Sequence, residues 1–406
     1  MNILHTGDWH LGKTLEGFSR LEEQEIFLDD FVRIVEEHHI DLVIIAGDVY
    51  DSYNPSAKAE KMFYDTLKRL SDDGKRLTLV IAGNHDSPDR LVAAGPLARD
   101  HGIIMMGTPK TVVEPGVYGQ HRIVDSEEGF IEIEINGESV VIVAVAFPSE
   151  KRLNEVLYTG MESDEEKLTS YEDRMKLLFN NLEKHYREDS INLLVSHLFV
   201  MGSVESGSER SIQLGGSYLI NSAILPETAQ YIALGHVHKP QVVPGSNKRA
   251  RYSGSPIHYS KNEINFQKSL VKIRLAPMQA PDIEEIPLKT YKPIEVWQCD
   301  NLASALKKCE ENSSRDCWVY LEIKTDQYLK ENQIKELKEL KKDIISIRPI
   351  THEEIAGNKE TKTFRERAFE DLFKDFYMHQ RGKEASQETM DMIMSLVYGE
   401  DEYEAD

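Results

Sequence analysis

The sequence has few cysteines, and its basic residues are outnumbered by its acidic ones. Three cysteines occur in 406 residues and no two of them form a Cys-x-x-Cys pair. We therefore expect reduced thiols, a cytoplasmic protein and no zinc finger. The net charge of -22 excludes a protein that coats nucleic acid through overall positive charge. It does not exclude a local basic groove or a basic partner.

Long apolar runs are also missing. No stretch approaches the roughly 20 apolar residues that a membrane-spanning helix needs. The opening MNILHTGDWHLG does not resemble a signal peptide, so no leader is expected. Hydrophobic residues make up 40% of the chain and charged residues 29%, which is typical of a globular protein with a sizeable core. A chain of this length predicts two or three domains.

Short apolar runs alternate with amphipathic segments in the first third of the chain. Expected strands cover residues 3–6, 42–48 and 76–86, and expected helices cover residues 22–39 and 56–74, the second ending at Gly74. This alternation predicts an α/β fold with helices on the faces of a partly parallel sheet. Within residues 130–148, a strictly alternating stretch turns at Asn136-Gly137 and continues as an apolar run, which is typical of a hairpin. The sheet layer is therefore mixed, as one sheet or as two.

Five apolar runs end in polar residues of the kinds that bind metals. These ends are Gly7-Asp8-Trp9-His10, Gly47-Asp48-Val49-Tyr50-Asp51, Gly83-Asn84-His85-Asp86, Ser196-His197 and Gly235-His236-Val237-His238. In open α/β sheets, sites form at the carboxyl ends of the strands, so strands that end together would bring these side chains together. Taken alone, each block fits a polar loop equally well, and His236 and His238 fit two solvated side chains.

The types of side chain in these blocks limit the metals. Aspartate, histidine and asparagine without thiolate suit Mn²⁺, Fe²⁺ or Zn²⁺ better than a soft metal. Seven candidate ligands are too many for one ion with an open position. They suit two ions bridged by one carboxylate, about 3.5–4 Å apart, which is the arrangement of two-metal hydrolytic sites. A histidine that is not a ligand could protonate the leaving oxygen.

The ordered blocks Asp-x-His, Gly-Asp-x-x-Asp, Gly-Asn-His-Asp, a single His and Gly-His-x-His resemble the calcineurin-like metallophosphoesterase superfamily. The resemblance implies a four-layer sandwich in which two mixed sheets are flanked by helices. It implies that Asp8, His10, Asp48 and His238 hold one metal, and that Asp48, Asn84, His197 and His236 hold the other. Asp48 would bridge the two ions and His85 would face the substrate as general acid. Asp51 and Asp86 are further catalytic candidates.

Longer stretches resemble one family within this superfamily. The stretches HTGDWHLG, AGDVYD, VIAGNHDSPDRL and RYSGSPIHYSKNE are similar to those of the SbcD family, the nuclease subunits of bacterial SbcCD complexes. The resemblance covers residues 1 to about 275 in detail. It implies a Mn²⁺-dependent DNA nuclease of repair and recombination that cuts DNA ends and hairpins, as a double-strand exonuclease and single-strand endonuclease. It also implies a homodimer, an SbcC-type coiled-coil ATPase partner and a place at the nucleoid.

The chain divides into four predicted regions. Residues 1–280 are expected to form the nuclease domain, residues 288–350 a small two-layer α/β capping domain, residues 355–400 a helical segment, and residues 401–406 a disordered acidic end. The β-α-β-α-β pattern and the proline-rich junction favour a separate capping domain over an extension of the main fold. The helical segment carries an apolar stripe that either packs on the protein itself or docks on the ATPase partner. The stripe contains Phe364, Phe369, Phe373, Phe376 and Tyr377.

The surfaces for DNA and for a second copy of the chain are less well defined by the sequence. The candidates for DNA contact are Lys13, Arg90, Lys239, Arg249 and Arg251, although the last two fit a solvated loop equally well. Residues 56–70 and 89–100 are candidates for the dimer surface. A small-substrate phosphodiesterase or nucleotidase and a non-catalytic scaffold are the alternatives to a nuclease. The extra domain and the striped tail favour the nuclease, and the intact ligand set argues against the scaffold.

Overall fold

The computed structural model describes residues 1–157, 170–209, 219–325, 329–350, 386 and 389–390. These residues cluster into two compact units. Residues 1–297, 312–320 and 341–346 that the structure describes belong to the first unit, and the described residues within 298–311, 321–340 and 347–350 belong to the second. Within the described ranges, no helix combines the length and the apolar character that crossing a membrane requires.

The first large sheet has six strands and lies in the first unit. In spatial order it contains β18 (Asp282–Pro287), β17 (Ser269–Arg274), β1 (Asn2–Thr6), β4 (Leu42–Ala46), β5 (Leu77–Ile81) and β6 (Ile103–Met106). Strands β1, β4, β5 and β6 are parallel, whereas β17 and β18 are added antiparallel. Every residue of β4 and β5 is buried, as expected for parallel strands covered on both faces.

The second large sheet has eight strands and lies in the same unit. Its order is β15 (Gln241–Val242), β16 (Ala250–Tyr252), β14 (Tyr231–Gly235), β11 (Ile191–His197), β10 (Glu138–Val145), β9 (Phe130–Ile135), β8 (His121–Glu127) and β7 (Gly116–Tyr118). Strands β10, β11, β14 and β16 pair in parallel. Each of the other strands pairs antiparallel with its neighbours. Two short pairs complete the unit: β2 (Thr14–Leu15) with β3 (Phe18–Ser19), and β12 (Phe199–Val200) with β13 (Leu219–Ile220).

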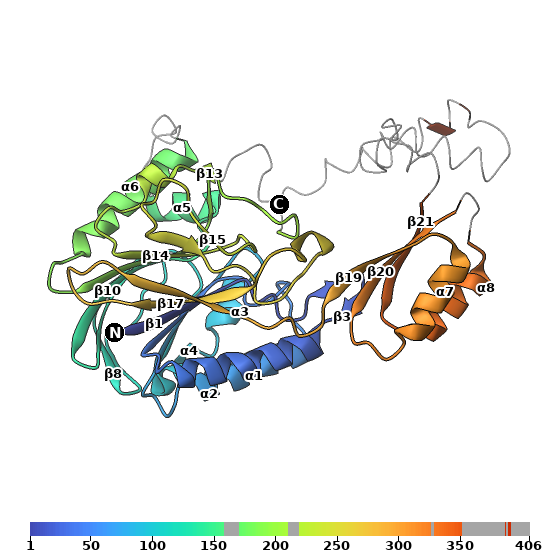
Figure 1. Cartoon of the computed structure of the whole chain (residues 1–406). Coiled ribbons are helices and arrows are strands. Elements are labelled where there is room, and N and C mark those ends of the chain that lie inside the picture. The colour runs from blue at the N-terminus through green and yellow to red at the C-terminus, as the bar shows by residue number, and fades with distance from the viewer. Residues whose placement is uncertain (158–169, 210–218, 326–328, 351–385, 387–388, 391–406) are drawn as a thin grey trace. The chain divides into compact units, whose positions relative to one another are not determined.

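Helices cover the outer face of each large sheet, so the first unit has four layers (Figure 1). Helices α1 (Leu21–Glu37) and α2 (Ala57–Leu70) lie on the first sheet, with α3 (Pro88–Val92) and α4 (Gly95–Ala98) beside β6, and α5 (Glu150–Leu157) and α6 (Tyr171–Leu182) lie on the second. Short 3-10 turns span Arg99–His101, Glu183–His185, Ser222–Ile224 and Lys261–Glu263. This is the four-layer sandwich of two mixed sheets that the family resemblance implies.

Strand β10 shows how the layers are packed. Its side chains alternate between two apolar cores, because successive residues of a strand point to opposite faces. Val140, Ile142 and Ala144 join the core shared with the first sheet, and Val141, Val143 and Val145 join the core beneath α5 and α6. The second sheet is therefore apolar on both faces, and the carboxyl ends of its parallel strands are held against the first sheet.

The C-terminal part of the described chain follows the predicted β-α-β-α-β order. It contains β19 (Ile294–Cys299), α7 (Leu302–Glu311), β20 (Trp318–Lys324), α8 (Glu331–Leu340) and β21 (Ile344–Ile350). The strands form one sheet in the order β19-β20-β21, and α7 packs against α8. The boundaries 1–280 and 288–350 stay a prediction. The predicted segments 355–400 and 401–406 lie outside the described residues, apart from Ser386, Thr389 and Met390.

Two local predictions have different outcomes. The hairpin is confirmed, since β9 and β10 flank Asn136 and Gly137, whose φ angles are 53° and 84°. The helix predicted to end at Gly74 ends instead at Leu70. Asp72 and the residue after it have φ angles of 45° and 55°, which a right-handed helix cannot contain, so the chain turns before Gly74 is reached.

Candidate metal centre

The candidate ligands lie where strands of both large sheets end. Asp8 follows β1, Asp48 follows β4 and Asn84 follows β5 in the first sheet. His197 is the last residue of β11, and His236 directly follows β14 in the second sheet. The parallel strands of each sheet deliver these side chains to one edge, and the sandwich brings the two edges together.

The two sheets meet closely at the ends of β4 and β14. A Cβ atom on Gly235 would lie 1.9 Å from the carbonyl oxygen of Ala46, and one on Gly47, whose φ is 89°, would lie 2.4 Å from Nδ1 of His197. Only glycine permits such an approach. Because both side chains are missing, His197 Nδ1–H donates to the carbonyl oxygen of Ala46 at 2.9 Å. This hydrogen bond keeps a proton on Nδ1 of His197, and Nε2 of the same ring faces the candidate ligands.

Four candidate ligands have a strained backbone. The φ angles are 53° at Asp8, 44° at His10, 50° at Asp48 and 105° at His236. The left-handed region costs residues other than glycine about 1–3 kcal/mol each and is tolerated where the surrounding structure enforces it, commonly at functional sites. At each of these positions the left-handed backbone accompanies a side chain that belongs to one of the ligand clusters.

One cluster of ligands contains Asp8, His10 and His238. Their potential ligand atoms all lie within 4.8 Å of one another. Nε2 of His10 is 2.9 Å from Nε2 of His238. Asp8 Oδ1 accepts a hydrogen bond from the backbone N–H of His236 at 2.8 Å, while its buried Oδ2 has no hydrogen-bond partner in the described part of the chain. These are the residues predicted for the first metal, apart from Asp48.

The second cluster contains Asp48, His197 and His236, also within 4.8 Å. The amide oxygen of Asn84 lies 2.9 Å from Nε2 of His197 and 3.2 Å from Nδ1 of His236, so Asn84 joins this cluster. Nε2 of His236 is buried and finds no hydrogen-bond partner among the described residues. The four residues are those predicted for the second metal.

Asp48 lies between the two clusters. Its Oδ2 is 3.5 Å from Nε2 of His10 in one cluster and 3.5 Å from Nε2 of His197 in the other. Its Oδ1 accepts from the backbone N–H of His85 at 2.9 Å, which fixes the carboxylate plane. A carboxylate in this position can bridge two ions. Buried oxygen and nitrogen donors without partners, no thiolate and a shared carboxylate fit a pair of hard or borderline divalent cations.

Burial and charge shift the pKa values in the centre. Burial opposes the charging of His197, but the carboxylates of Asp48 and Asp8 outweigh it and raise the pKa of His197 to about 9. Burial also disfavours the charged form of Asp48, yet His197 holds the pKa of Asp48 well below its usual range. Burial raises the pKa of Asp8 to about 6 and lowers that of His10 to about 3. At neutral pH the metal-free centre therefore holds a proton on His197.

His85 lies beside the metal ligands and is held by Asp51. Nδ1–H of His85 donates to the backbone carbonyl oxygen of Asp51 at 2.7 Å, and no residue that the structure describes forms a hydrogen bond with its buried Nε2. The ring meets that of His10 edge-on, with centroids 4.7 Å apart. The Asp51 carboxylate lies 3.5 Å from Nδ1 of His10 and 2.8 Å from Nζ of Lys13. Asp51 thus positions both histidines.

Asp86 has different surroundings from the other two catalytic candidates. Its buried carboxylate accepts backbone N–H groups from Gly83, Val49 and Tyr50 at 2.8–3.2 Å. Burial, with Asp48 nearby, raises the pKa of Asp86 to about 7. These hydrogen bonds tie the loop after β5 to the loop after β4, and this arrangement favours a role in shaping the loops over contact with substrate.

All five DNA-contact candidates already have partners in the structure. Lys13 is paired with Asp51 at the centre, Arg90 with Glu60 at 3.0 Å, and Lys239 lies 4.7 Å above the ring of Phe266. Lys239 directly follows the ligand His238 in the sequence, so Lys13 and Lys239 are the two candidates that the structure brings near the centre.

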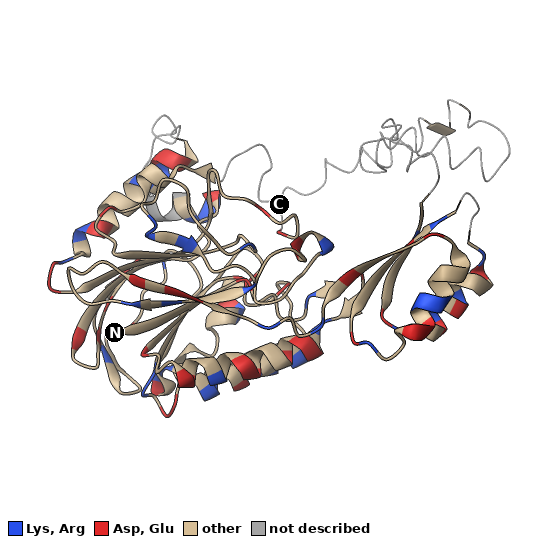
Figure 2. Ribbon diagram, viewed as in Figure 1, with Lys and Arg blue, Asp and Glu red and all other residues tan. Residues whose placement is uncertain are grey.

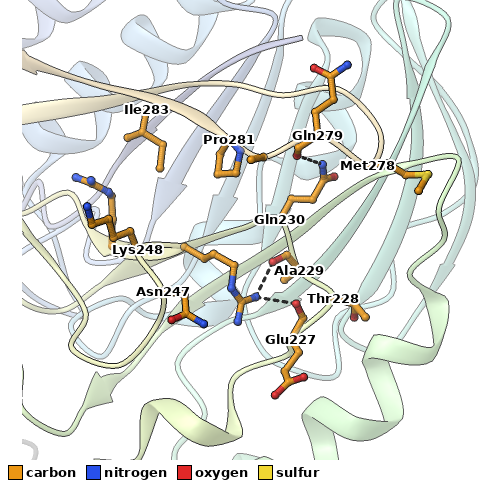
Figure 3. A pocket seen from close by; sticks show the side chains of 13 residues that line it. Glu227, Thr228, Ala229, Gln230, Asn247, Lys248, Met278, Gln279, Pro281 and Ile283 are labelled. Atoms are coloured by element: carbon orange, nitrogen blue, oxygen red, sulfur yellow. Dashed lines mark hydrogen bonds between the residues drawn. The ribbon is translucent and has the colours of Figure 1, made fainter.

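Arg249 and Arg251 line a cavity of about 650 Å³ that contains no candidate ligand (Figure 3). The Arg249 guanidinium donates to three backbone carbonyl oxygens, of residues 226, 227 and 229, and Arg251 pairs with Glu285 at 2.6 Å. Arg249 lies beside the start of β14, because its carbonyl accepts from Ile232. At roughly 3.3 Å per residue, this is about 13 Å along the strand from the end that carries the ligands. This position gives DNA contact by Arg249 no support, and the Arg251 guanidinium is already paired with Glu285.

Sequence reasoning missed a polar network behind His238. Ser208, Glu209, Glu263 and Lys268 surround the ring and the backbone of this ligand. Glu263 falls within the stretch RYSGSPIHYSKNE, which carries the family resemblance, but nothing in its spacing marks it as a neighbour of His238.

The predicted partner-docking stripe stays a prediction. All of its members lie outside the described residues, namely Phe364, Phe369, Phe373, Phe376 and Tyr377.

Comparisons with known proteins match both parts of the chain. Residues 1–240 match the family model described as Calcineurin-like phosphoesterase, and residues 290–381 match that described as Type 5 capsule protein repressor C-terminal domain. The SbcD subunit of the SbcCD nuclease of Bacillus subtilis is 39% identical over 409 residues and covers 100% of both chains. Its namesake from Rhodobacter capsulatus is 32% identical over 72% of this chain and 71% of that one. The crystal structure of TT1561 of Thermus thermophilus is 13% identical, covers 70% of this chain and 98% of that one, and has a TM-score of 0.35.

The proton on His197 predicts how metal binding depends on pH. A divalent ion binds the neutral imidazole, so at any pH below about 9 it must displace this proton. We expect the apparent affinity for Mn²⁺ to rise with pH, by up to about tenfold per pH unit for one displaced proton. Isothermal titration calorimetry at about pH 7, 7.75 and 8.5, in buffers of different ionisation enthalpy, measures both affinity and proton release. An affinity that stays flat, with no proton release, would contradict this assignment.

Proposed function

Because this chain belongs to the calcineurin-like phosphoesterase family, and within it to the SbcD family of nuclease subunits, we propose that it hydrolyses DNA phosphodiester bonds with two Mn²⁺ ions. The position of Asp48 carries this proposal, since its Oδ2 lies 3.5 Å from a histidine of each cluster. Two ions held there would offset the negative charge of a phosphodiester and lower the pKa of water. Asp8, His10, Asp48 and His238 would hold one ion, and Asp48, Asn84, His197 and His236 the other.

His85 is the proposed general acid. Its Nδ1–H is committed to the carbonyl oxygen of Asp51, so the proton that it gives to the leaving oxygen must be carried on Nε2. That nitrogen has no hydrogen-bond partner among the residues that the structure describes, and the residue is 9% exposed. Asp51 keeps the ring in place through its backbone and contacts His10 through its carboxylate. Asp86 helps to keep His85 and Asp51 in place, because its carboxylate holds the loop after β4 and the loop after β5 together.

The charge distribution supports the proposal that this chain binds DNA together with a partner. The chain carries a net charge of -22, and α1 carries seven acidic residues and one basic residue, Arg33. Figure 2 shows Lys and Arg interspersed with Asp and Glu on the other described elements. Binding to DNA phosphates depends on a local excess of positive charge. We propose that Lys13 and Lys239 contact the DNA near the cut, and that an SbcC-type coiled-coil ATPase at the nucleoid supplies most of the affinity. The small-substrate alternative is not favoured, because the B. subtilis SbcD protein matches this chain along its whole length.

The proposed homodimer has a candidate surface beside α2 and α4. An apolar groove of about 330 Å³ is lined by Tyr64, Leu67, Leu97, Ala98, Ile103 and Met105. Leu97 is 79% exposed at its rim. Both predicted dimer segments, residues 56–70 and 89–100, contribute to this groove, and a second copy of the chain would bury its apolar side chains.

Replacing His85 tests the proposed reaction. We expect His85→Asn to keep both metal sites and to lower cleavage of end-labelled linear duplex DNA in Mn²⁺ by about 10²–10⁴-fold, because asparagine cannot deliver a proton. The matched control is His39→Asn, which changes an exposed histidine at the end of α1 and should cleave normally. Undiminished cleavage by His85→Asn would contradict the acid role. Hydrolysis of bis(p-nitrophenyl) phosphate without any DNA cleavage would favour the small-substrate alternative.

Replacing Leu97 tests the dimer surface. Leu97→Glu places a charge on the groove. Burying an unpaired charge in a dimer interface is strongly unfavourable, so this variant should be a monomer. Light scattering coupled to gel filtration measures the change from dimer to monomer. The exposed Met278, in Met278→Glu, serves as the control that keeps the dimer. A wild-type chain that is monomeric at high concentration, or a Leu97→Glu variant that stays dimeric, would count against this surface.

A further inference from the structure

The two ring nitrogens of His238 face different groups. Nε2 lies 2.9 Å from Nε2 of His10, on the side of the metal centre. Nδ1 lies 2.5 Å from the hydroxyl oxygen of Ser208. Ser208 is in the loop after β12, thirty residues before His238 in the sequence. A metal ligand uses one ring nitrogen for the ion, and the group bonded to the other nitrogen sets the tautomer.

The Ser208 hydroxyl leads to a buried ion pair. It donates to Oε1 of Glu263, and Oε2 of Glu263 accepts from Nζ of Lys268 at 2.6 Å. Lys268 also donates to the carbonyl oxygen of His238 at 2.9 Å and to the hydroxyl of Ser255 at 2.8 Å. Glu263 is 0% exposed and Lys268 is 2% exposed, so solvent does not screen this pair. The network thus contacts both the side chain and the backbone of the ligand.

The acceptors in this network determine which atom donates in each hydrogen bond. The ionised carboxylate of Glu263 can only accept hydrogen bonds, so the single hydroxyl proton of Ser208 points to Glu263. The lone pairs of Ser208 are then presented to Nδ1 of His238, which must be the donor. That tautomer leaves Nε2 of His238 without a proton, as a metal ligand requires.

Glu209 holds the same loop in place. Its carboxylate accepts the backbone N–H groups of Ser206, Gly207 and Ser208 at 2.8–3.1 Å, and that of His238 at 2.9 Å. The loop and the ligand are therefore fastened to one carboxylate. Such an arrangement fixes the distance between the Ser208 hydroxyl and the imidazole ring before any ion binds.

We propose that Ser208 and Glu263 are positioning residues that hold His238 in its Nδ1–H tautomer and so preform one of the two metal sites. This inference rests on the proposed function only in assigning His238 to a metal ion. The network does not touch His197 or His236 through any described contact, so its effect should be confined to the site that contains His238.

Removal of the Ser208 hydroxyl tests the proposal without DNA. Titration calorimetry with Mn²⁺ should show that Ser208→Ala loses about 10- to 100-fold in affinity at one of the two sites and none at the other, the usual range for removing such a partner. Ser208→Thr keeps a hydroxyl and should restore most of the affinity. Ser203→Ala removes a hydroxyl from the same loop that is not bonded to His238, Ser208 or Glu263, and should match the wild type.

A second measurement tests the tautomer directly, and its wild-type half requires no variant to fold. In the metal-free wild-type chain, long-range ¹⁵N–¹H spectra of labelled histidine should show His238 protonated at Nδ1, and Ser208→Ala should shift the ring towards a mixture of tautomers. Protonation at Nε2 in the wild type would overturn the proposal, as would wild-type Mn²⁺ affinity in Ser208→Ala or an equal loss at both sites. A wild-type chain that binds no Mn²⁺ would instead contradict the metal centre itself, and this inference with it.

Discussion

The hydrogen bond from His197 to the carbonyl oxygen of Ala46 joins the two sheets at the point where the candidate ligands converge. It is 2.9 Å long and crosses from the end of β11 to the end of β4. It forms because Gly47 and Gly235 leave room that any side chain would fill. If these strands stood further apart, Asp48 could not lie within 3.5 Å of a histidine from each cluster. The spacing of the backbones thus sets the spacing of the ligands.

The metal-free centre is costly to maintain, and this cost indicates what the site is built to hold. Four of its residues have a left-handed backbone, and several buried carboxylates and imidazoles crowd together. Buried like charges and unpaired donors are unfavourable unless ions or protons compensate them. The proton on His197 provides part of this compensation in the metal-free chain. Divalent cations would provide more, and they would relieve the repulsion between Asp8 and Asp48.

Much of the centre could be predicted from the sequence, because its blocks are short and each follows a strand. Periodicity predicts where β4 and β5 end, and strands of one parallel sheet end at one edge, so Asp48 and Asn84 had to be neighbours. The same reasoning could not separate Arg249 from the centre. A basic stretch near a metal-binding block appears close to it in the sequence, but Arg249 lies at the opposite end of β14 and its guanidinium is bonded to backbone carbonyls.

The network behind His238 shows a second limit. Ser208 and Glu263 are 55 residues apart and meet only because two loops fold over one ligand. Their separation in the sequence does not predict that they are in contact. Similarly, the catalytic interpretation of Asp86 followed from its place in a motif, whereas its backbone hydrogen bonds could be seen only in the structure. Motifs predict which residues gather, and three-dimensional contacts decide which of them face the substrate.

The most direct test of this account is a crystal structure of the Mn²⁺-soaked protein with anomalous diffraction recorded at the manganese absorption edge. The account predicts two anomalous peaks about 3.5–4 Å apart, with the Asp48 carboxylate contacting both. Asn84, His197 and His236 should surround one peak, and Asp8, His10 and His238 the other. A single peak, or two peaks of which Asp48 contacts only one, would contradict the bridging role on which the account depends.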